Sequence, residues 1–475
     1  MSNAAPLTIF RTLTTIPRDS GDEKGIAEYL VSFARERGME AIADDAYNVV
    51  IRKPGTAGYE NAPVLVLQSH SDMVYIKNDG CMHDYNSPLK LIEKDGYLSA
   101  DGTSLGADNG IGMAYALAIL DSTDLTHPPL EALFTTSEET GMEGVNSLSP
   151  SFLKGRRMIN LDSEWEGTFT VGCAGGVTPV FSRKASWETA PAGYKSFKLI
   201  VHGLLGGHSG VEIEKGRGNA IRMLARVMYA ANTELGAHIS AMEGGSKTNA
   251  IPNRSEAVLL VRDENALKKL VDKYDSAFKY ELSASDKDVS LTMQPCETDG
   301  KVLTADVLRN VLTLLLTIPV NVQTMSMHLK DLVESSNNIG ILHCDEDAVT
   351  ITCSIRSSVR TLKDSLRDQM TLLAEAVHAD IRFNSDYPEW AFAVNSPLRD
   401  KAVEVYEELY DKKPEVISIH AGLECGFFKA IYPDMDMIST GPNLTDVHTP
   451  QEKLDIASAE RVYTWLTKLI AELKD

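Results

Sequence analysis

The N-terminal part of the chain alternates between short apolar runs and segments with helical spacing. Residues 23–37 place Ile26, Leu30 and Phe33 on one face and stop at Gly38, which predicts an amphipathic helix. Short apolar runs between turn residues are typical of strands buried on both faces, and they occur at residues 48–52, 64–67, 130–135 and 158–161. A segment rich in Ala, Met and Leu at 110–120 predicts a helix. This alternation predicts an α/β layer.

A second pattern begins near Lys195, where strand, long helix, strand, strand and helix follow in that order. Its first elements are residues 198–201, 219–231 and 257–261. The segment 246–251 with the apolar run after it resembles residues 335–340 with the run 348–352, and a helical segment follows each. This weak internal duplication predicts an α+β domain built from two similar halves side by side.

The α/β pattern returns after Asp386. The elements predicted there are helices at 397–410, 424–430 and 457–473, and strands at 415–419 and 436–439. The first domain therefore resumes, and the middle segment is an insertion. We predict a discontinuous catalytic domain over residues 1–182 and 387–475, with a lid domain over residues 183–386.

Composition narrows the class of protein. A chain of 475 residues is long enough for two domains, and its formal net charge of -21 disfavours nucleic acid or an anionic membrane as a partner. The six cysteines lie far apart without any zinc-finger spacing, so we expect reduced thiols. The opening residues contain no continuous apolar segment, and the longest weakly polar stretch is too short to span a bilayer. We therefore expect a cytoplasmic protein.

Side chains that can bind metal ions follow several of the apolar runs. His70-Ser71-Asp72 comes directly after the run 64–67. The others are Asp108, the pair Glu138-Glu139, Asp162 and, far downstream, His448. Open α/β sheets gather their sites at one edge, so we expect these residues to converge there. A single acid or histidine is usually a surface or structural residue, but the joint pattern predicts a two-metal hydrolase.

A two-metal site needs about three protein ligands for each ion, usually with one shared carboxylate. We expect His70 and Asp162 to bind one ion, Glu139 and His448 to bind the other, and Asp108 to bridge them. Mixed imidazole and carboxylate ligands suit two Zn²⁺ ions per chain, with Mn²⁺ or Co²⁺ able to substitute. Asp72 would orient a ligand. Glu138 is the candidate general base, because its neighbour Glu139 can bind the metal while Glu138 faces the water.

Ten sequence blocks extend this pattern over nearly the whole chain: LQSHSDMV, GTSLGADNGIGMA, TTSEETGMEG, NLDSEWEG, GCAGG, GLLGGHSG, KTNAIP, SIRS, IHAGLECGFF and DVHTPQEKL. In order and spacing they resemble the co-catalytic zinc exopeptidases that include the carnosinases. The resemblance implies a phosphorylase/hydrolase-like three-layer catalytic domain with a mixed sheet, plus an inserted α+β lid of two ferredoxin-like halves. It implies the same metal ligands, orienting acid and base as the residue pattern does.

The resemblance also implies roles for residues of the lid. His208 would stabilise the tetrahedral oxyanion, as an imidazolium can, and Arg356 would bind the substrate carboxylate through its guanidinium fork. Asn249 would lie near that carboxylate, and Gly422 would approach the substrate backbone. The alternatives are that His208 only marks a tight turn between glycines, that Arg356 is a surface residue and that Asn249 caps a turn.

The implied function is that of a metal-dependent dipeptidase acting by metal-activated water attack. Its expected partners are small unblocked dipeptides, with aminoacyl-histidine types such as carnosine in range, and a homodimer is possible. A related amidohydrolase, either an acylamino-acid deacylase or a tripeptidase, would share the metal site and differ in the lid. A catalytically silent scaffold of the same fold is the alternative from another class, and it need not bind two ions.

Overall fold

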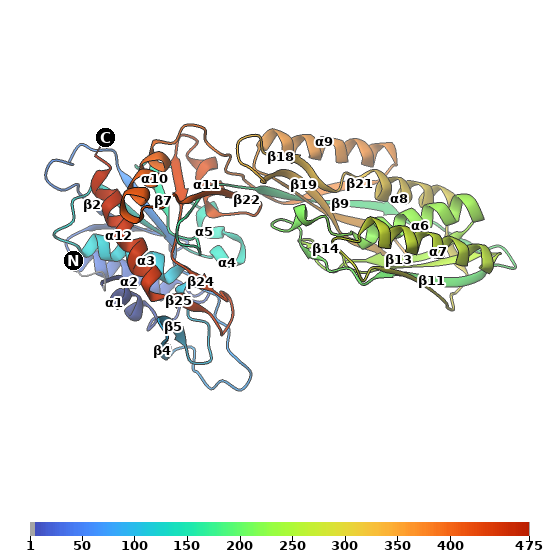
Figure 1. Cartoon of the computed structure of the whole chain (residues 1–475), viewed down its shortest axis with the longest axis horizontal. Coiled ribbons are helices and arrows are strands. Elements are labelled where there is room, and N and C mark those ends of the chain that lie inside the picture. Colours follow the sequence, from blue (N-terminus) through green and yellow to red (C-terminus); the bar gives the residue numbers. More distant parts are fainter. Residues whose placement is uncertain (1–4, 475) are drawn as a thin grey trace. The chain divides into compact units, whose positions relative to one another are not determined.

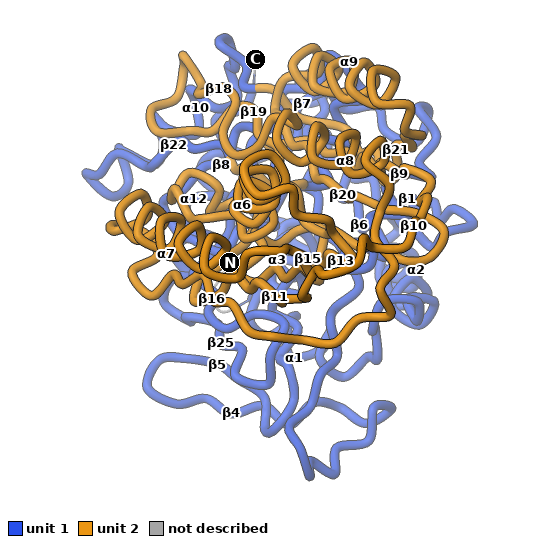
Figure 2. The backbone as a smooth tube through the Cα atoms, turned by 90° about the vertical axis from the view of Figure 1, so that its right-hand side faces the viewer, with its two compact units in different colours: residues 1–172, 392–418, 423–475 blue, residues 173–391, 419–422 orange. Residues whose placement is uncertain are grey.

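Two units, each assembled from separated parts of the sequence, make up the computed structural model, which describes residues 5–474 (Figure 1). Unit 1 comprises Met1–Gly172, Phe392–Ser418 and Leu423–Asp475, and unit 2 comprises Cys173–Ala391 and Ile419–Gly422 (Figure 2). The boundaries predicted from the sequence fall inside β9 (Gly175–Lys184) and β21 (Asp380–Tyr387). These two strands pair with each other in the sheet of unit 2, which therefore extends further at both ends than the sequence pattern indicates.

Unit 1 contains an eight-stranded sheet in the order β1-β2-β6-β3-β7-β23-β8-β22. Its strands are β1 (Glu40–Ala43), β2 (Val49–Lys53), β6 (Leu130–Thr135), β3 (Leu65–His70), β7 (Arg157–Asn160), β23 (Asp436–Ser439), β8 (Thr168–Cys173) and β22 (Glu415–Ile419). The central strands β6, β3, β7 and β23 run parallel, while β1, β2 and β8 pair antiparallel with their neighbours. The sheet is therefore mixed, as expected, and the continuous apolar runs form its buried strands.

Both faces of this sheet are covered. Leu65, Leu67 and Ile159 share one apolar core with helices α1 (Ala5–Leu13), α2 (Lys24–Glu36), α3 (Ala107–Asp121), α10 (Pro397–Tyr410) and α12 (Ile456–Glu472). The alternate residues Val66 and Met158 are also buried, but they lie outside that core because successive side chains of a strand point to opposite faces. On this unit α11 (Glu424–Ile431) packs against α5 (Glu143–Asn146). The expected three-layer arrangement is confirmed.

A small four-stranded sheet of unit 1 joins segments that are far apart in the sequence. Its order is β24-β25-β5-β4, with β24 (Leu444–Thr445), β25 (Lys453–Asp455), β5 (Tyr97–Ala100) and β4 (Leu91–Lys94). β25 pairs with β5 through Leu454 and Leu98. The pairing places the hairpin loop 446–452 beside the segment that leads into α3. No such pairing is apparent in the apolar pattern of the sequence.

Unit 2 is built from two halves that each follow the order strand, helix, strand, strand, helix, strand. The first half consists of β11 (Lys195–His202), α6 (Ala220–Leu235), β13 (His238–Gly244), β15 (Ser255–Val261), α7 (Glu264–Glu281) and β16 (Ser290–Pro295). The second consists of β9, α8 (Ala305–Thr317), β19 (Val333–Cys344), β20 (Ala348–Ser357), α9 (Arg360–Ala376) and β21. The first half is inserted between β9 and α8 of the second.

The strand order of the nine-stranded sheet, β16-β11-β15-β13-β19-β20-β9-β21 with β18 (Asn321–Met325) on β19, confirms the internal duplication. Numbered within each half, the strands lie in the order 4-1-3-2 and meet at Gly244 of β13 and Leu342 of β19. Each half is therefore ferredoxin-like, as expected. The remaining short elements of this unit are β10 (Trp187–Thr189), β17 (Lys301–Leu303), β12 (Gly207–His208), β14 (Ala250–Ile251) and the 3-10 helix Ile213–Lys215. Among residues 5–474, no helix combines the length and apolar character that crossing a bilayer requires.

Candidate metal centre

Three neighbouring parallel strands deliver most of the candidate ligands to one edge of the sheet of unit 1. The pairing of His70 with Thr135, and of Gln68 with Asn160, aligns the carboxyl ends of β3, β6 and β7. His70 is the last residue of β3, the pair Glu138-Glu139 begins the short helix α4 (Glu138–Gly141) after β6, and Asp162 follows β7. These side chains converge as expected for the crevice at the carboxyl ends of an α/β sheet.

Asp108 and His448 reach the same edge from other elements. Asp108 lies in the first turn of α3, where its backbone is not helical (φ -80°, ψ 110°) and its peptide bond to Asn109 is cis. His448 lies in the hairpin loop between β24 and β25 and adopts a left-handed backbone with φ 59°. Neither residue follows a strand of the main sheet, because the start of α3 positions Asp108 and the hairpin between β24 and β25 positions His448.

The two histidines meet opposite oxygens of one carboxylate. His70 Nε2 lies 3.1 Å from Asp108 Oδ1, and His448 Nε2 lies 3.1 Å from Asp108 Oδ2. Asp162 Oδ1 is 3.2 Å from His70 Nε2, and Glu139 Oε1 is 2.9 Å from His448 Nε2. The structure thus forms two triads that share Asp108, and each triad has its ligand atoms within 4.8 Å of one another.

These separations suit the coordination of divalent ions. Tetrahedral zinc with nitrogen and oxygen ligands at about 2.0–2.1 Å places neighbouring ligand atoms about 3.3 Å apart. The observed separations between imidazole and carboxylate atoms, 2.9 to 3.2 Å, are close to that value. The donor set of imidazole and carboxylate groups is also one that zinc accepts. The residues present therefore fit a pair of ions bridged by Asp108.

Charge crowding at the site agrees with this fit. Hydrogen bonds that the His448 ring donates to the carboxylates of Asp108 and Glu139 raise the pKa of His448 to about 10, which outweighs the effect of its partial burial. Burial raises the pKa of Asp162, and the neighbouring Asp108 adds to that effect against the opposing influence of His70. These two shifts favour the protonated forms of His448 and Asp162. A divalent ion would displace those protons, so ion binding here is expected to release protons to solution.

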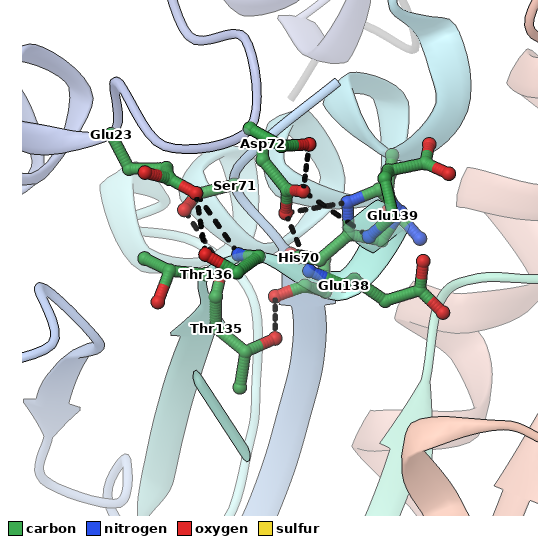
Figure 3. Close-up of polar contacts among 12 residues, drawn as sticks. Glu23, His70, Ser71, Asp72, Thr135, Thr136, Glu138 and Glu139 are labelled. Carbon is green, nitrogen blue, oxygen red and sulfur yellow. Dashed lines mark hydrogen bonds and ion pairs between the residues drawn. The ribbon is translucent and has the colours of Figure 1, made fainter. Parts of the chain in front are cut away.

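Asp72 organises the residues around it although it belongs to neither triad. Its Oδ1 lies 3.3 Å from His70 Nδ1, on the side of the ring opposite the triads. The carboxylate also accepts hydrogen bonds from the backbone N–H groups of Glu138 and Glu139 at 3.2 and 3.3 Å (Figure 3). A third hydrogen bond comes from Ser20 Oγ at 2.7 Å. Burial alone would raise the pKa of Asp72, but the hydrogen bonds lower it to about 2. An ionised Asp72 thus fixes both the imidazole of His70 and the start of α4.

Glu138 begins α4 beside the candidate ligands. One of its carboxylate oxygens can join His70 and Glu139 in a third group of possible ligand atoms. Burial raises the pKa of Glu138 well above its usual value, and the carboxylates of Asp162, Glu424 and Glu139 raise it further, while His70 opposes the shift. A carboxylate with a raised pKa accepts a proton readily, which is the property a general base needs near neutral pH.

A buried polar network under this edge was not anticipated from the sequence. Glu424, at the start of α11, accepts hydrogen bonds from Gln68 Nε2 at 2.7 Å and Thr135 Oγ1 at 2.9 Å. The Gln68 side chain in turn accepts a hydrogen bond from Asn160. Burial is the main reason that the pKa of Glu424 is raised to about 8. A signal was available, because the polar Gln68 directly follows the apolar run 64–67, and a polar group inside a covered sheet requires buried partners.

The candidate substrate residues all belong to unit 2. β12 carries His208 and pairs with β14, which begins directly after Asn249, and the Ser209 N–H donates to the Asn249 carbonyl at 2.9 Å. Arg356 on β20 is only 8% exposed, which argues against a simple surface role, and its Nη1 donates to Tyr387 Oη at 3.0 Å. The ring of Tyr387 also packs against Gly422, because a Cβ added to Gly422 would lie 2.9 Å from that ring. Tyr387 was not singled out from the sequence.

Backbone groups determine the tautomer of His208. Its Nδ1 accepts hydrogen bonds from the N–H groups of Gly210 at 3.2 Å and Val211 at 3.1 Å, so the ring proton is assigned to Nε2. Burial lowers the pKa of His208, and the positive charge of Arg356 lowers it further. The two hydrogen bonds to Nδ1 and the lowered pKa both favour a neutral ring that donates through Nε2 over the expected imidazolium. His420 packs beside this loop, since a Cβ at Gly210 would lie 2.4 Å from its carbonyl oxygen.

Comparison with known proteins gives consistent matches along the chain. The model of peptidase family M20/M25/M40 matches residues 66–472. The cytosol non-specific dipeptidase of Escherichia coli (strain K12) is 39% identical over 468 residues, which cover 98% of this chain and 96% of that protein. The crystal structure of an aminoacylhistidine dipeptidase from Vibrio alginolyticus has a TM-score of 0.96 at 36% identity, covering 99% of this chain and 96% of that one. An aminopeptidase from Bacillus cereus, with a TM-score of 0.59 at 17% identity and full coverage of both chains, shares the fold.

Proposed function

Because the chain belongs to peptidase family M20/M25/M40, we propose that it is a metal-dependent dipeptidase that hydrolyses unblocked dipeptides. The observation that carries the proposal is the pair of triads that share Asp108, in a chain similar over 98% of its length to a dipeptidase. Aminoacyl-histidine dipeptides are within the proposed substrate range, since a similar structure has the name aminoacylhistidine dipeptidase. The cytoplasm is the proposed location.

We assign two divalent ions to the site, with zinc as the proposed metal. His70, Asp162 and Asp108 would hold one ion, and Glu139, His448 and Asp108 the other. When bound, such a pair of ions lowers the pKa of water and polarises a carbonyl group. The assignment is supported by the separations between ligand atoms and by the bridging position of Asp108.

The side chains divide the remaining work of peptide hydrolysis. Glu138 would take the proton from the attacking water and deliver it to the leaving amine, which its raised pKa favours. Asp72 would hold the backbone of Glu138 in place through the 3.2 Å hydrogen bond. His208 would donate from Nε2 to the oxygen that becomes negative during the attack. A neutral donor serves this purpose, because the hydrogen bond strengthens as charge develops on its acceptor.

Recognition of the substrate's free carboxylate is proposed for Arg356. Its guanidinium can form a bidentate pair with a carboxylate, and the bond to Tyr387 leaves other N–H groups for that purpose. Asn249 and Gly422 are proposed to contact the same end of the substrate. The possible homodimer stays a prediction.

The bridging role of Asp108 predicts that Asp108→Ala loses both ions together. The purified native protein is expected to hold about two ions per chain, because two triads are present, and the variant to hold almost none. Metal analysis by plasma emission spectrometry after exhaustive dialysis measures this. Asp101→Ala removes an exposed aspartate whose side chain pairs with Lys90, so it is expected to keep the native metal content. An Asp108→Ala protein that keeps one full ion would show that the bridge is elsewhere.

Turnover of a small substrate panel tests the proposed function. Unblocked dipeptides, including carnosine, are expected to be hydrolysed, and a chelator is expected to abolish the activity until zinc is added back. The panel also contains N-acetylated amino acids and tripeptides. A preference for the acetylated substrates would identify a deacylase, and a preference for tripeptides a tripeptidase. No turnover of any of them by the metal-loaded protein would favour a silent scaffold.

A further inference from the structure

The loop that carries His448 ends in a glutamate that reaches the start of α3. Glu452 is 2% exposed, and its carboxylate accepts four backbone hydrogen bonds. Oε2 accepts from Leu105 and Gly106 at 2.7 and 2.9 Å, and Oε1 accepts from Ala107 and Asp108 at 2.7 and 3.2 Å. These N–H groups lie where a helix leaves its donors unpaired, and a negative charge is favoured there. One side chain thus joins the Asp108 segment to the His448 loop.

A buried arginine holds the same segment from its carbonyl side. Arg18 is 1% exposed, and its guanidinium donates to the backbone carbonyls of Ser71 at 3.1 Å and Asp72 at 2.7 Å. It also donates to the carbonyl of Gly106. Residue 106 therefore gives its N–H to Glu452 and its carbonyl to Arg18. Gly106 has a left-handed backbone with φ 66°, and a Cβ added to it would lie 2.7 Å from Arg18 Nη2. Both observations explain why a glycine is required there.

Together, these contacts connect three separate parts of the metal centre. The arginine links the segment after β3 to the segment before α3, and the glutamate links that second segment to the hairpin loop. Neither side chain belongs to a triad, so neither is a candidate ligand. Burial of both charges suits them to a fixed position, because a buried carboxylate or guanidinium must keep its hydrogen-bond partners.

We propose that Arg18 and Glu452 are positioning residues for the metal-dependent reaction, because they fix Asp108 relative to Asp72 and His448. We call this pair the Arg18–Glu452 clamp. The proposal rests on the function proposed above and adds to it. The hairpin loop depends on such a contact for a fixed position, because the His448 side chain is 45% exposed and the loop lies outside the main sheet. Without the carboxylate at 452, nothing else on the loop bonds the N–H groups at the start of α3 among the described contacts.

The test compares Glu452→Gln with Glu131→Gln. Glu131 is the matched control, because it is also 2% exposed in unit 1 and accepts backbone hydrogen bonds from Lys154 and Gly155 at 2.8 and 2.9 Å, yet belongs to no triad. A side-chain amide at position 452 has only one oxygen, so it can accept from only part of the four N–H groups. We expect both variants to lose thermal stability, whereas only Glu452→Gln weakens ion binding, by about 10–100-fold as for other residues that orient ligands.

Titration of the metal-free proteins with Co²⁺ gives the decisive readout, through both the affinity and the visible absorption spectrum of the bound ion. We expect the spectrum of Glu452→Gln to change and that of Glu131→Gln to match the unmodified protein. If Glu452→Gln lowers the melting temperature but leaves the affinity and spectrum unchanged, the clamp is a purely structural device and the proposal is overturned.

A milder variant keeps the proposal testable if Glu452→Gln does not fold. Arg18→Lys retains the charge but cannot reach the three carbonyls with one fixed fork. It is expected to show the same loss of Co²⁺ affinity to a smaller extent, and native affinity would count against the clamp. Failure of the proposed function is separable from failure of the clamp. The first appears as absence of dipeptide turnover by the unmodified protein, and the second as unaltered Co²⁺ binding by the variants.

Discussion

Glu138→Gln is expected to lower kcat/KM for a dipeptide by about 10²–10⁴-fold while the metal content stays native. Glutamine has nearly the same shape but cannot accept the proton of the attacking water. The backbone bonds from Glu138 and Glu139 to Asp72 do not depend on the side chain at 138, so the site should keep its form. Steady-state kinetics combined with metal analysis measures both parts of the prediction. Glu143→Gln changes an exposed glutamate on the next short helix and should be fully active.

Two results would contradict the role assigned to Glu138. A variant with near-native turnover would show that another group takes the proton. Loss of an ion from Glu138→Gln would instead make Glu138 a ligand, which the third group of possible ligand atoms, formed with His70 and Glu139, allows geometrically. Metal analysis therefore separates the two roles that a carboxylate at this position could have.

Amidation of the C-terminus of a good dipeptide should cost about 2–5 kcal/mol in transition-state binding, measured from the ratio of kcat/KM for acid and amide. The physical reason is that Arg356 is largely buried, and an amide would leave its charge without a partner. Arg356→Ala should lower the activity on the free acid and largely remove the difference between acid and amide. The contact would then set the distance from the scissile bond to the chain end, which excludes longer peptides.

Arg360→Ala is the control for this prediction, since Arg360 begins the following helix and its side chain is 55% exposed. It should leave the ratio of acid to amide unchanged. Equal cleavage of acid and amide by the unmodified enzyme would show that Arg356 does not recognise the carboxylate. The preference for dipeptides would then need another cause.

The sequence was most informative where burial dictates the residue pattern. Strands covered on both faces need continuous apolar runs, and the runs at 64–67, 130–135 and 158–161 correspond to β3, β6 and β7. Parallel neighbours end at the same edge, so the convergence of His70, Glu139 and Asp162 could be predicted. The family resemblance and the two ferredoxin-like halves are confirmed as well, because both leave repeated or ordered blocks in the sequence.

Residues that act on distant backbone groups could not be found in this way. Arg18 donates to carbonyl groups more than 50 positions away, and Glu452 accepts from N–H groups more than 340 positions away. The local pattern of apolar and polar residues contains no trace of such hydrogen bonds. The position of His448 likewise depends on the pairing of Leu454 with Leu98. The tautomer of His208 depends on two backbone N–H groups whose direction only the folded loop determines.

The position of β23 affects the order in which parts of this protein can fold. β7 and β8 follow each other closely in the chain, yet β23 lies between them, with Met437 paired to Met158 and Ser439 paired to Thr170. While the ribosome is still producing the middle of the chain, this part of the sheet has a gap with an unpaired strand edge on either side. Such edges attract other strands. Unit 1 can complete its sheet only after residue 439 has emerged, so its folding finishes late and the nascent chain has to be kept from aggregating until then.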